Sequence, residues 1–248
     1  MQVLICGYGV VGRFVHGQIK DAAIVSAYDP NIKEYCDDSI FNNRFDIAFI
    51  CVPTNSLPDG SANITLVQEA VSRINAETVV IKSAIPVGTA ASFNNDSIVV
   101  SPEYCGATPH SGNSQGFVVL GGKQPYLDKV AALYHKAKNG AFRVRFTNWQ
   151  TAELAKYMEN CFLALKVTFC AEFYNIATAN GISYPELREI FIMDERMGDS
   201  HTYVYPDKPF YDSHCLNKDV PALIHQSDGM ANLMKTVHQI NTARKRNA

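Results

Sequence analysis

The chain has 248 residues, of which 47% are apolar and 19% are charged, and its formal net charge is −2. This size and composition predict a soluble globular protein with one large or two modest domains. The small net charge gives no electrostatic reason to expect nucleic acid or an anionic membrane as a partner. No apolar run is long enough to cross a membrane and no signal peptide is recognisable, so we expect a cytoplasmic protein.

The first half of the chain alternates short apolar runs with helical patterns. Continuous apolar runs of this kind are typical of parallel strands that are buried on both faces. Residues 1–148 therefore predict an α/β domain of the Rossmann type, with a doubly wound parallel sheet. The expected strands are Val3–Cys6, Ile24–Tyr28, Ile47–Val52, Thr78–Ile81, Ser97–Val100 and Phe117–Leu120, and the expected helices include Val10–Gln18, Ile64–Ile74 and Tyr126–Ala137.

The second half, residues 149–248, predicts a helical domain with one long central helix. From Thr151 to about Asn180 there is neither proline nor glycine and the apolar residues go nearly all the way round, which indicates a long buried helix that ends at Gly181. Ser183–Glu186 has the spacing of a capping box and predicts the start of another helix. Asp219 is a candidate N-cap for a helix that begins with Val220 and Pro221.

A glycine-rich turn follows the first expected strand and opens the first expected helix. The sequence Gly7-Tyr8-Gly9-Val10-Val11-Gly12 fits G-x-G-x-x-G, in the context that a dinucleotide-binding turn requires. Asp29 ends the next strand, where a carboxylate accepts hydrogen bonds from ribose hydroxyls and repels a 2′-phosphate, so NAD is favoured over NADP. Pro53 and Thr54 follow a central strand, at the sheet edge where ligands of such folds bind. The alternative is a chance glycine turn in a doubly wound protein that binds another ligand.

Cys215 is followed closely by Lys218 and Asp219. A nearby cation favours the thiolate, which is the nucleophilic form of cysteine. Alternatively, Cys215 is a small packed hydrophobic residue, since reduced cysteine is often buried. The seven cysteines form no C-x-x-C pair and no zinc-like grouping, so we expect neither a disulfide framework nor a structural metal.

Lys156 and Asn160 are four residues apart and share one face of the long helix. They are suited to holding a substrate oxygen. Alternatively, they form a solvated stripe with Glu153 and Glu159.

Taken together, these features resemble the UDP-glucose/GDP-mannose 6-dehydrogenase family. Six segments carry the resemblance in the family's order: Gly7–Gly12, Ile85–Thr89, Ser101–Tyr104, Ala152–Lys156, Asp194–Gly198 and Cys215–Asp219. The family's third domain has no counterpart in these residues, so we expect a short form. The resemblance implies a role in nucleotide-sugar metabolism and polysaccharide biosynthesis.

The resemblance implies a two-step oxidation of a nucleotide-sugar C6 alcohol to a carboxylate, with NAD as the cofactor. Cys215 matches the nucleophile that forms a thiohemiacetal and then a thioester. Asp219 and Glu103 match residues that assist proton transfer, and Lys218 matches a residue held near the cofactor and the thiol. Arg196 matches a residue that reaches the neighbouring subunit, which implies a homodimer through the long helix. The implied substrate-binding residues are Glu103, Tyr104, Lys156, Asn160, Arg196 and Tyr211.

The chain departs from the family's pattern close to the nucleophile. Asp212 and Ser213 replace a pair of glycines, and Asn217 replaces a proline. Two other hypotheses therefore stay open. One is a non-catalytic NAD-binding partner of a full-length dehydrogenase. The other is a single-step enzyme of the 3-hydroxyacid dehydrogenase kind, in which Cys215 is structural.

Overall fold

The computed structural model describes residues 1–104, 116–137, 140 and 142–247. They form two compact units. Unit 1 holds the described residues of 1–55, 62–105 and 114–156, and unit 2 holds those of 56–61 and 157–248. The chain leaves unit 1 after Lys156, inside the long helix, whereas the sequence places the domain boundary between residues 148 and 149. That boundary stays a prediction.

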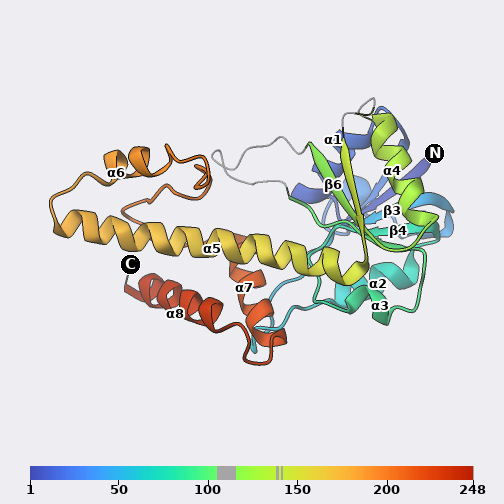
Figure 1. Ribbon diagram of the computed structural model, residues 1–248. Helices are drawn as coiled ribbons and strands as arrows, with labels where there is room; N and C mark the ends of the chain where they lie inside the picture. Colours follow the sequence, from blue (N-terminus) through green and yellow to red (C-terminus); the bar gives the residue numbers. More distant parts are fainter. Residues whose placement is uncertain (105–115, 138–139, 141, 248) are drawn as a thin grey trace. The chain divides into compact units, whose positions relative to one another are not determined.

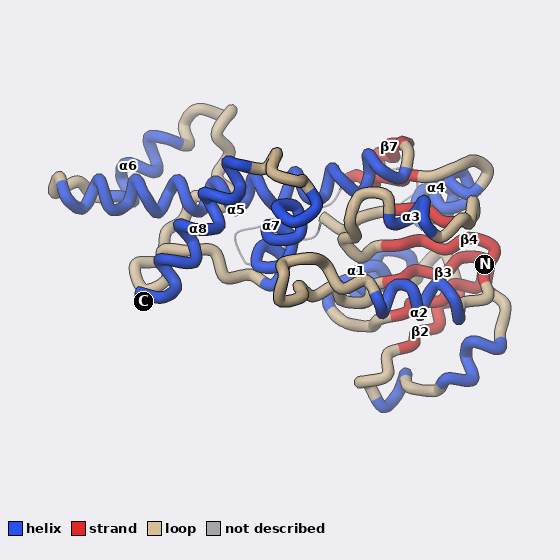
Figure 2. The backbone as a smooth tube through the Cα atoms, turned by 90° about the horizontal axis from the view of Figure 1, so that it is seen from below, coloured by secondary structure: helices blue, strands red, loops and turns tan. Residues whose placement is uncertain are grey.

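Unit 1 is built on a seven-stranded sheet with the order β2-β1-β3-β4-β5-β6-β7. Neighbouring strands are parallel except for β5 and β6, which pair antiparallel. The predicted doubly wound α/β fold is confirmed, although β6 and β7 run against the other strands; Figure 2 shows β2 and β7 at opposite edges of the sheet. The strands are β1 (Gln2–Cys6), β2 (Ile24–Tyr28), β3 (Phe45–Ile50), β4 (Ala76–Ile81), β5 (Ile98–Val100), β6 (Phe117–Gly121) and β7 (Arg143–Thr147).

Helices cover both faces of this sheet (Figure 1). Because successive side chains of a strand point to opposite faces, Val3 and Ile5 of β1 pack with α1 and α4, whereas Leu4 of β1 packs with α2 and α3. Each face therefore has its own apolar core. The helices of unit 1 are α1 (Val10–Ile19), α2 (Thr65–Arg73), α3 (Thr89–Ser92) and α4 (Tyr126–Ala137), together with the 3-10 helices η1 (Lys33–Tyr35) and η2 (Asp38–Asn42).

The turn from β1 into α1 depends on two glycines. Gly7 has a φ of +91°, and a Cβ added to it would lie 2.8 Å from the carbonyl carbon of Cys51. A Cβ on Gly12 would lie 2.1 Å from the carbonyl oxygen of Gly7. The first glycine thus permits the tight turn, and the third permits α1 to pack closely against the strand.

Unit 2 consists of helices around the long helix α5 (Trp149–Ala179), whose first residues belong to unit 1. The other helices are α6 (Tyr184–Phe191), α7 (His214–Gln226) and α8 (Asn232–Asn247). The predicted long helix is confirmed, and it ends just before Gly181, whose φ is +68°. No helix in the described part of the chain combines the length and apolar character needed to span a membrane.

The sequence predicts a long buried helix that is apolar nearly all the way round, and one face of α5 is exposed in the described chain. Apolar side chains at positions 158, 162, 169, 173 and 176 are 41–74% exposed. Their spacing of four, seven, four and three residues keeps them on one side of the helix. We call this set, Met158, Phe162, Phe169, Phe173 and Ile176, the apolar row.

Two predictions about helix starts also change. The helix that carries Asp219 begins at His214, and its N-cap is Ser213, whose hydroxyl accepts a hydrogen bond from Leu216 N at 3.2 Å. Asp219 is therefore inside α7 and is not its cap; Pro221 also lies within the helix. The helix predicted at Ser183 does begin there, but the Ser183 side chain makes no capping hydrogen bond.

Replacement of Gly12 by alanine should destabilise the protein. The new Cβ would overlap the Gly7 carbonyl, and we expect a loss of about 1–3 kcal/mol in the free energy of unfolding, measured by urea denaturation. Gly17→Ala is the matched control, since Gly17 lies in the same helix with no atom within 4 Å of an added Cβ. A gain in stability is expected there, because alanine favours helix more than glycine does. Equal effects of the two substitutions would contradict the packing role of Gly12.

Candidate active site

The predicted cofactor residues gather where β1 and β3 end. β2 lies on one side of β1 and β3 on the other, so the strand order reverses at this point, where ligands bind in open α/β sheets. An added Cβ on Gly9 would have no atom within 4 Å, so the backbone there is open to a ligand. Gly9 precedes α1, whose first residues are Val10 and Val11, and a helix N-terminus favours phosphate groups.

Asp29 lies beside this turn, at the end of β2. Its Oδ2 accepts a hydrogen bond from Tyr8 N at 2.9 Å, and its Oδ1 accepts one from Asn31 N at 3.0 Å. The carboxylate is thereby fixed next to the glycine turn. The open space at Gly9 and the acceptor at Asp29 fit a dinucleotide, although NAD binding by these residues stays a prediction.

Pro53 and Thr54 follow β3 as expected, but their side chains differ in exposure. Pro53 is exposed, whereas Thr54 is 2% exposed and its hydroxyl donates to the carbonyl of Ala84 at 2.7 Å. In unit 1, Thr54 thus ties the loop after β3 to the loop after β4.

Tyr104 and Lys156, both predicted to bind substrate, lie together in unit 1. The Lys156 ammonium is 4.8 Å from the centre of the Tyr104 ring, a cation–π distance. The same ring lies 5.2 Å from that of Phe117. The structure thus brings together two side chains that are 52 positions apart.

The alternative of a solvated stripe on α5 is wrong for Glu153 and Asn160, which are 1% and 3% exposed. The Glu153 carboxylate accepts hydrogen bonds from Gly88 N at 2.6 Å and Ala90 N at 2.8 Å, at the start of α3. Burial raises the pKa of Glu153, and these two bonds oppose that effect. Glu153 therefore joins two of the segments that carried the family resemblance.

Glu103 forms a buried ion pair with Lys82. Their side chains are 5% and 2% exposed, and Lys82 Nζ lies 3.1 Å from Glu103 Oε2. Burial alone would lower the pKa of Lys82, but the Glu103 carboxylate raises it above its usual value of 10.5. Sequence reasoning missed Lys82, because a lysine directly after an apolar strand gives no sign of the acidic partner 21 residues later.

In unit 2, the Asp219 carboxylate is held by two polar side chains. Its Oδ2 accepts a hydrogen bond from Asn160 Nδ2 at 2.5 Å, and its Oδ1 pairs with Lys218 Nζ at 2.6 Å. Asp219 is 2% exposed and Asn160 is 3% exposed. Three predicted site residues, from α5 and α7, thus form one buried polar cluster.

Cys215 is exposed and is the second residue of α7. Lys218 and Asp219 follow it by three and four positions, so all three lie on one side of this helix. The sulfur is at the end of α7 where free backbone N–H groups stabilise negative charge. The alternative that Cys215 is a buried packing residue is wrong, because its side chain is exposed in the part of the chain that the structure describes.

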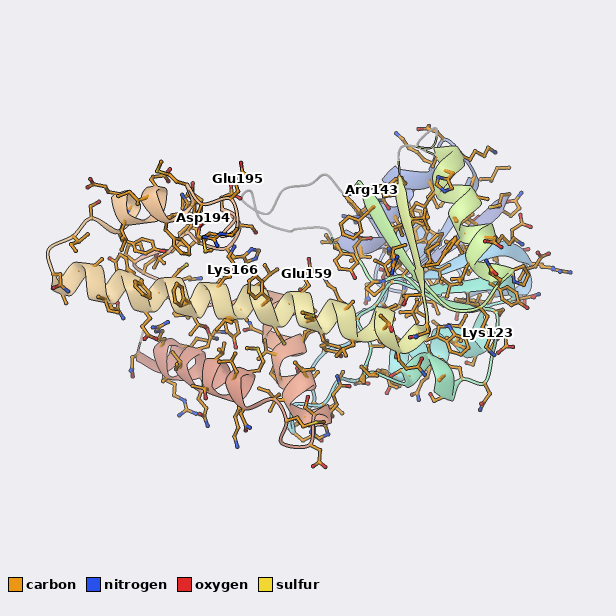
Figure 3. The ribbon with its side chains drawn as sticks, in the orientation of Figure 1. Lys123, Arg143, Glu159, Lys166, Asp194 and Glu195 are labelled. Carbon is orange, nitrogen blue, oxygen red and sulfur yellow. The ribbon has the colours of Figure 1, made fainter. Side chains whose placement is uncertain are left out.

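The remaining substrate candidates, Arg196 and Tyr211, both lie in the loop between α6 and α7. Arg196 is 82% exposed and pairs with Asp194. Lys166 of α5 donates to the carbonyls of Met197 and Gly198 at 3.1 and 3.2 Å, and it is seen with Asp194 in Figure 3. Tyr211 is 3% exposed and belongs to an apolar cluster, but it also lines a pocket of about 370 Å³. Its contact with a substrate stays a prediction.

The sheet, the glycine turn and the helical unit form the architecture that the family resemblance implies, and comparison with known proteins tests that resemblance. The NAD binding domain of the UDP-glucose/GDP-mannose dehydrogenase family matches residues 30–135, and the family's central domain matches residues 150–243. The chain belongs to the UDP-glucose/GDP-mannose dehydrogenase family. The glycine turn itself lies before the first matched residue.

The relatives include the UDP-glucose 6-dehydrogenase of Rhizobium meliloti, which is 28% identical over 225 residues. That match covers 81% of this chain and 51% of the relative. The chain spans about half or less of the length of the curated relatives that it matches.

Two solved structures share the fold. A UDP-glucose dehydrogenase from Pyrobaculum islandicum matches with a TM-score of 0.79 at 21% identity, over 98% of this chain and 68% of that chain. The 3-hydroxyisobutyrate dehydrogenase of Mycobacterium tuberculosis matches with a TM-score of 0.68 at 14% identity, over 98% of this chain and 92% of that chain.

The buried pair of Lys82 and Glu103 gives a prediction about stability and pH. Lys82→Met leaves a buried carboxylate without its cation, and we expect a loss of about 3–5 kcal/mol in the free energy of unfolding at pH 7.

Urea denaturation at pH 7 measures this effect. Lys123→Met is the control, since Lys123 pairs with Asp96 while 54% exposed, and we expect a change below about 1 kcal/mol there. In the wild type, the stabilisation from the pair should persist up to about pH 10 and be lost only as Lys82 deprotonates at higher pH. A loss in Lys82→Met no larger than the loss in Lys123→Met would argue against a stabilising role of the buried pair.

Proposed function

We propose that this chain carries out the NAD-dependent oxidation of a nucleotide-sugar C6 alcohol to a carboxylate, through a covalent intermediate on Cys215. The observation that carries the proposal is the cluster in unit 2. Asp219, one helical turn after the exposed thiol, is bound by both Lys218 and Asn160. A nucleophile, a cation, a carboxylate and an amide are the groups that such a reaction needs.

In the first oxidation, the alcohol loses a proton and a hydride and becomes an aldehyde. NAD, when bound, supplies the hydride acceptor for each oxidation. Lys156 and Asn160, one turn apart on α5, donate hydrogen bonds to the C6 oxygen and stabilise the negative charge that develops there. The Asp29 carboxylate selects NAD, because it accepts bonds from ribose hydroxyls and repels a 2′-phosphate.

In the second stage, the Cys215 thiolate adds to the aldehyde carbon, and the aldehyde oxygen gains a proton to give a thiohemiacetal. Loss of a proton and a second hydride converts this adduct into a thioester. Water then attacks the thioester carbon, the carbon–sulfur bond breaks, and the carboxylate and the free thiol are released. We assign the proton transfers chiefly to Asp219, because it lies one helical turn after Cys215 on the same helix, α7.

We further propose that the chain forms a homodimer through α5. The apolar row leaves large apolar side chains exposed along one face of this helix. Contiguous exposed apolar surface of this kind marks protein interfaces. A second copy of α5, with the same row, offers a self-complementary partner as a two-fold interface requires.

One observation favours a second candidate. The fold is shared with the 3-hydroxyisobutyrate dehydrogenase structure, at a TM-score of 0.68. A single-step oxidation without a covalent intermediate would suit that likeness. Asp212 and Ser213, in place of the family's two glycines next to the nucleophile, favour instead a non-catalytic NAD-binding partner.

The number of NADH molecules formed per sugar distinguishes these functions. With UDP-glucose, a UDP-N-acetyl sugar and GDP-mannose as the panel, we expect two NADH per molecule of the true substrate, measured by absorbance against product quantified by mass spectrometry. Cys215→Ser should form at most one NADH and release aldehyde, because the thioester cannot form. Cys36→Ser is the control, since Cys36 is also exposed.

The other outcomes have definite meanings. Two NADH from Cys215→Ser would end the thioester proposal. One NADH from the wild type would favour the single-step enzyme. Thermal stabilisation by NAD without turnover of the panel would favour the non-catalytic partner.

The dimer proposal is tested by a charge in the apolar row. Phe162→Arg should convert the dimer to a monomer in size-exclusion chromatography with light scattering, since it would bury two unpaired cations at the two-fold interface. Asn175→Arg is the control, because Asn175 is exposed on a different side of α5. Thermal unfolding verifies that both variants stay folded. A monomeric wild type, or a dimer that survives Phe162→Arg, would contradict the proposal.

A further inference from the structure

The C-terminal helix α8 holds the segment that leads into the nucleophile's helix. The Asn241 side chain makes two hydrogen bonds with the backbone of Tyr211: Oδ1 accepts from the amide at 2.8 Å, and Nδ2 donates to the carbonyl at 3.1 Å. Both residues are 3% exposed. Arg244 of α8 donates to the carbonyl of Thr168 in α5 at 3.1 Å. The chain just before α7 is thus fixed to α8 by a buried amide.

A second set of contacts joins a residue before Cys215 and a residue after it to α8. Lys245 Nζ pairs with the Asp212 carboxylate and donates to Asn217 Oδ1 at 2.9 Å. Asn217 Nδ2 donates to Asp212 Oδ1 at 3.0 Å, which closes a triangle of three side chains. Asp212 lies three residues before Cys215 and Asn217 lies two residues after it. One lysine of α8 therefore joins both ends of the short stretch that contains the thiol.

The same lysine balances the charge next to that thiol. Hydrogen bonds from Lys245, and then from Asn217, lower the pKa of Asp212, so this residue is a full negative charge at neutral pH. Three residues of chain span at most about 11 Å, so the Cα atoms of Asp212 and Cys215 lie within that distance and the carboxylate is near the thiol. With Lys245 in place, the two charges largely cancel there. Without it, the carboxylate would oppose the thiolate.

These contacts also account for two departures from the family's pattern. Asp212 and Asn217 stand where the family has a glycine and a proline, and both bind Lys245. A carboxylate introduced beside a nucleophilic thiol is unfavourable by itself, but the paired lysine removes that disadvantage.

We infer that Lys245 is a positioning residue for Cys215: by binding Asp212 and Asn217 together, it neutralises the carboxylate and fixes the first turn of α7, so that α8 sets the reactivity of the thiol. This inference rests on the proposed role of Cys215 as the nucleophile.

The test is the rate at which iodoacetamide alkylates Cys215 in the full chain, without NAD or sugar. Mass spectrometry of the peptide that contains Cys215 separates its rate from those of the other cysteines. Lys245→Met should slow alkylation at pH 7.5 by about two- to fourfold, because the carboxylate is left uncancelled. Adding Asp212→Asn to that variant should restore the rate, and Lys245→Arg should keep it. Lys235→Met is the control, since Lys235 is an exposed lysine of the same helix.

The two substitutions separate charge from packing. If the triangle only stiffened the chain, Asp212→Asn would add to the effect of Lys245→Met and would not reverse it. The inference is overturned if Lys245→Met behaves like Lys235→Met, or if the double variant is as slow as Lys245→Met alone. Neither result depends on turnover, so failure of the proposed function, seen as two NADH from Cys215→Ser, is distinguishable from failure of this inference.

Discussion

The burial of the Asp219 carboxylate is the constraint on which the helical unit depends. An ionised carboxylate that is removed from water without partners costs several kcal/mol, so it must be paired and hydrogen-bonded. Lys218 supplies the charge and Asn160 supplies the neutral donor. Since Asn160 belongs to α5 and Asp219 to α7, this requirement fixes the two helices against each other at one point. The thiol at position 215 is carried by the same helix and is oriented as a consequence.

Glu153 plays a comparable part in unit 1. Its carboxylate satisfies the backbone amides of Gly88 and Ala90, which open a helix of only four residues. The first four amides of any helix lack partners within the helix, so a helix this short depends on donors and acceptors from elsewhere. The first part of α5 thereby fixes the loop after β4, and Thr54 holds the same loop from another side. Two acidic residues, one in each unit, thus attach α5 to its surroundings.

Much of the fold could be predicted from the sequence, for identifiable reasons. Strands buried on both faces appear as unbroken apolar runs, so β1, β3 and β4 were evident, and the absence of proline and glycine marked α5. Strand β7 was missed because it lies at the sheet edge, where two arginines alternate with apolar residues and leave no continuous run. Proline is usually found in the first turn of a helix, so Pro221 predicts a helix start near residue 220. In the structure α7 begins at His214 and Pro221 lies in its interior. Local preference indicated the commoner arrangement, and tertiary contacts determined the observed one.

In the candidate site, too, some features are indicated by the sequence and others depend on contacts that form only on folding. Helix α5 illustrates both. Residue types and spacing make Cys215, Asp219, Lys156 and Asn160 candidates, but the pairing of Glu103 with Lys82 depends on two strand ends that meet only after folding. For α5, the sequence correctly indicated a helix that is apolar nearly all round. Such a pattern predicts a helix that other residues cover on most faces, but it does not indicate whether those residues belong to this chain or to another. Some faces of α5, including those that carry Cys161, Ala164 and Cys170, are covered by other residues of this chain, whereas the side chains of the apolar row are 41–74% exposed. A side chain such as Phe162 is costly to leave in water, so its exposed fraction of 59% is the observation that supports the proposed dimer.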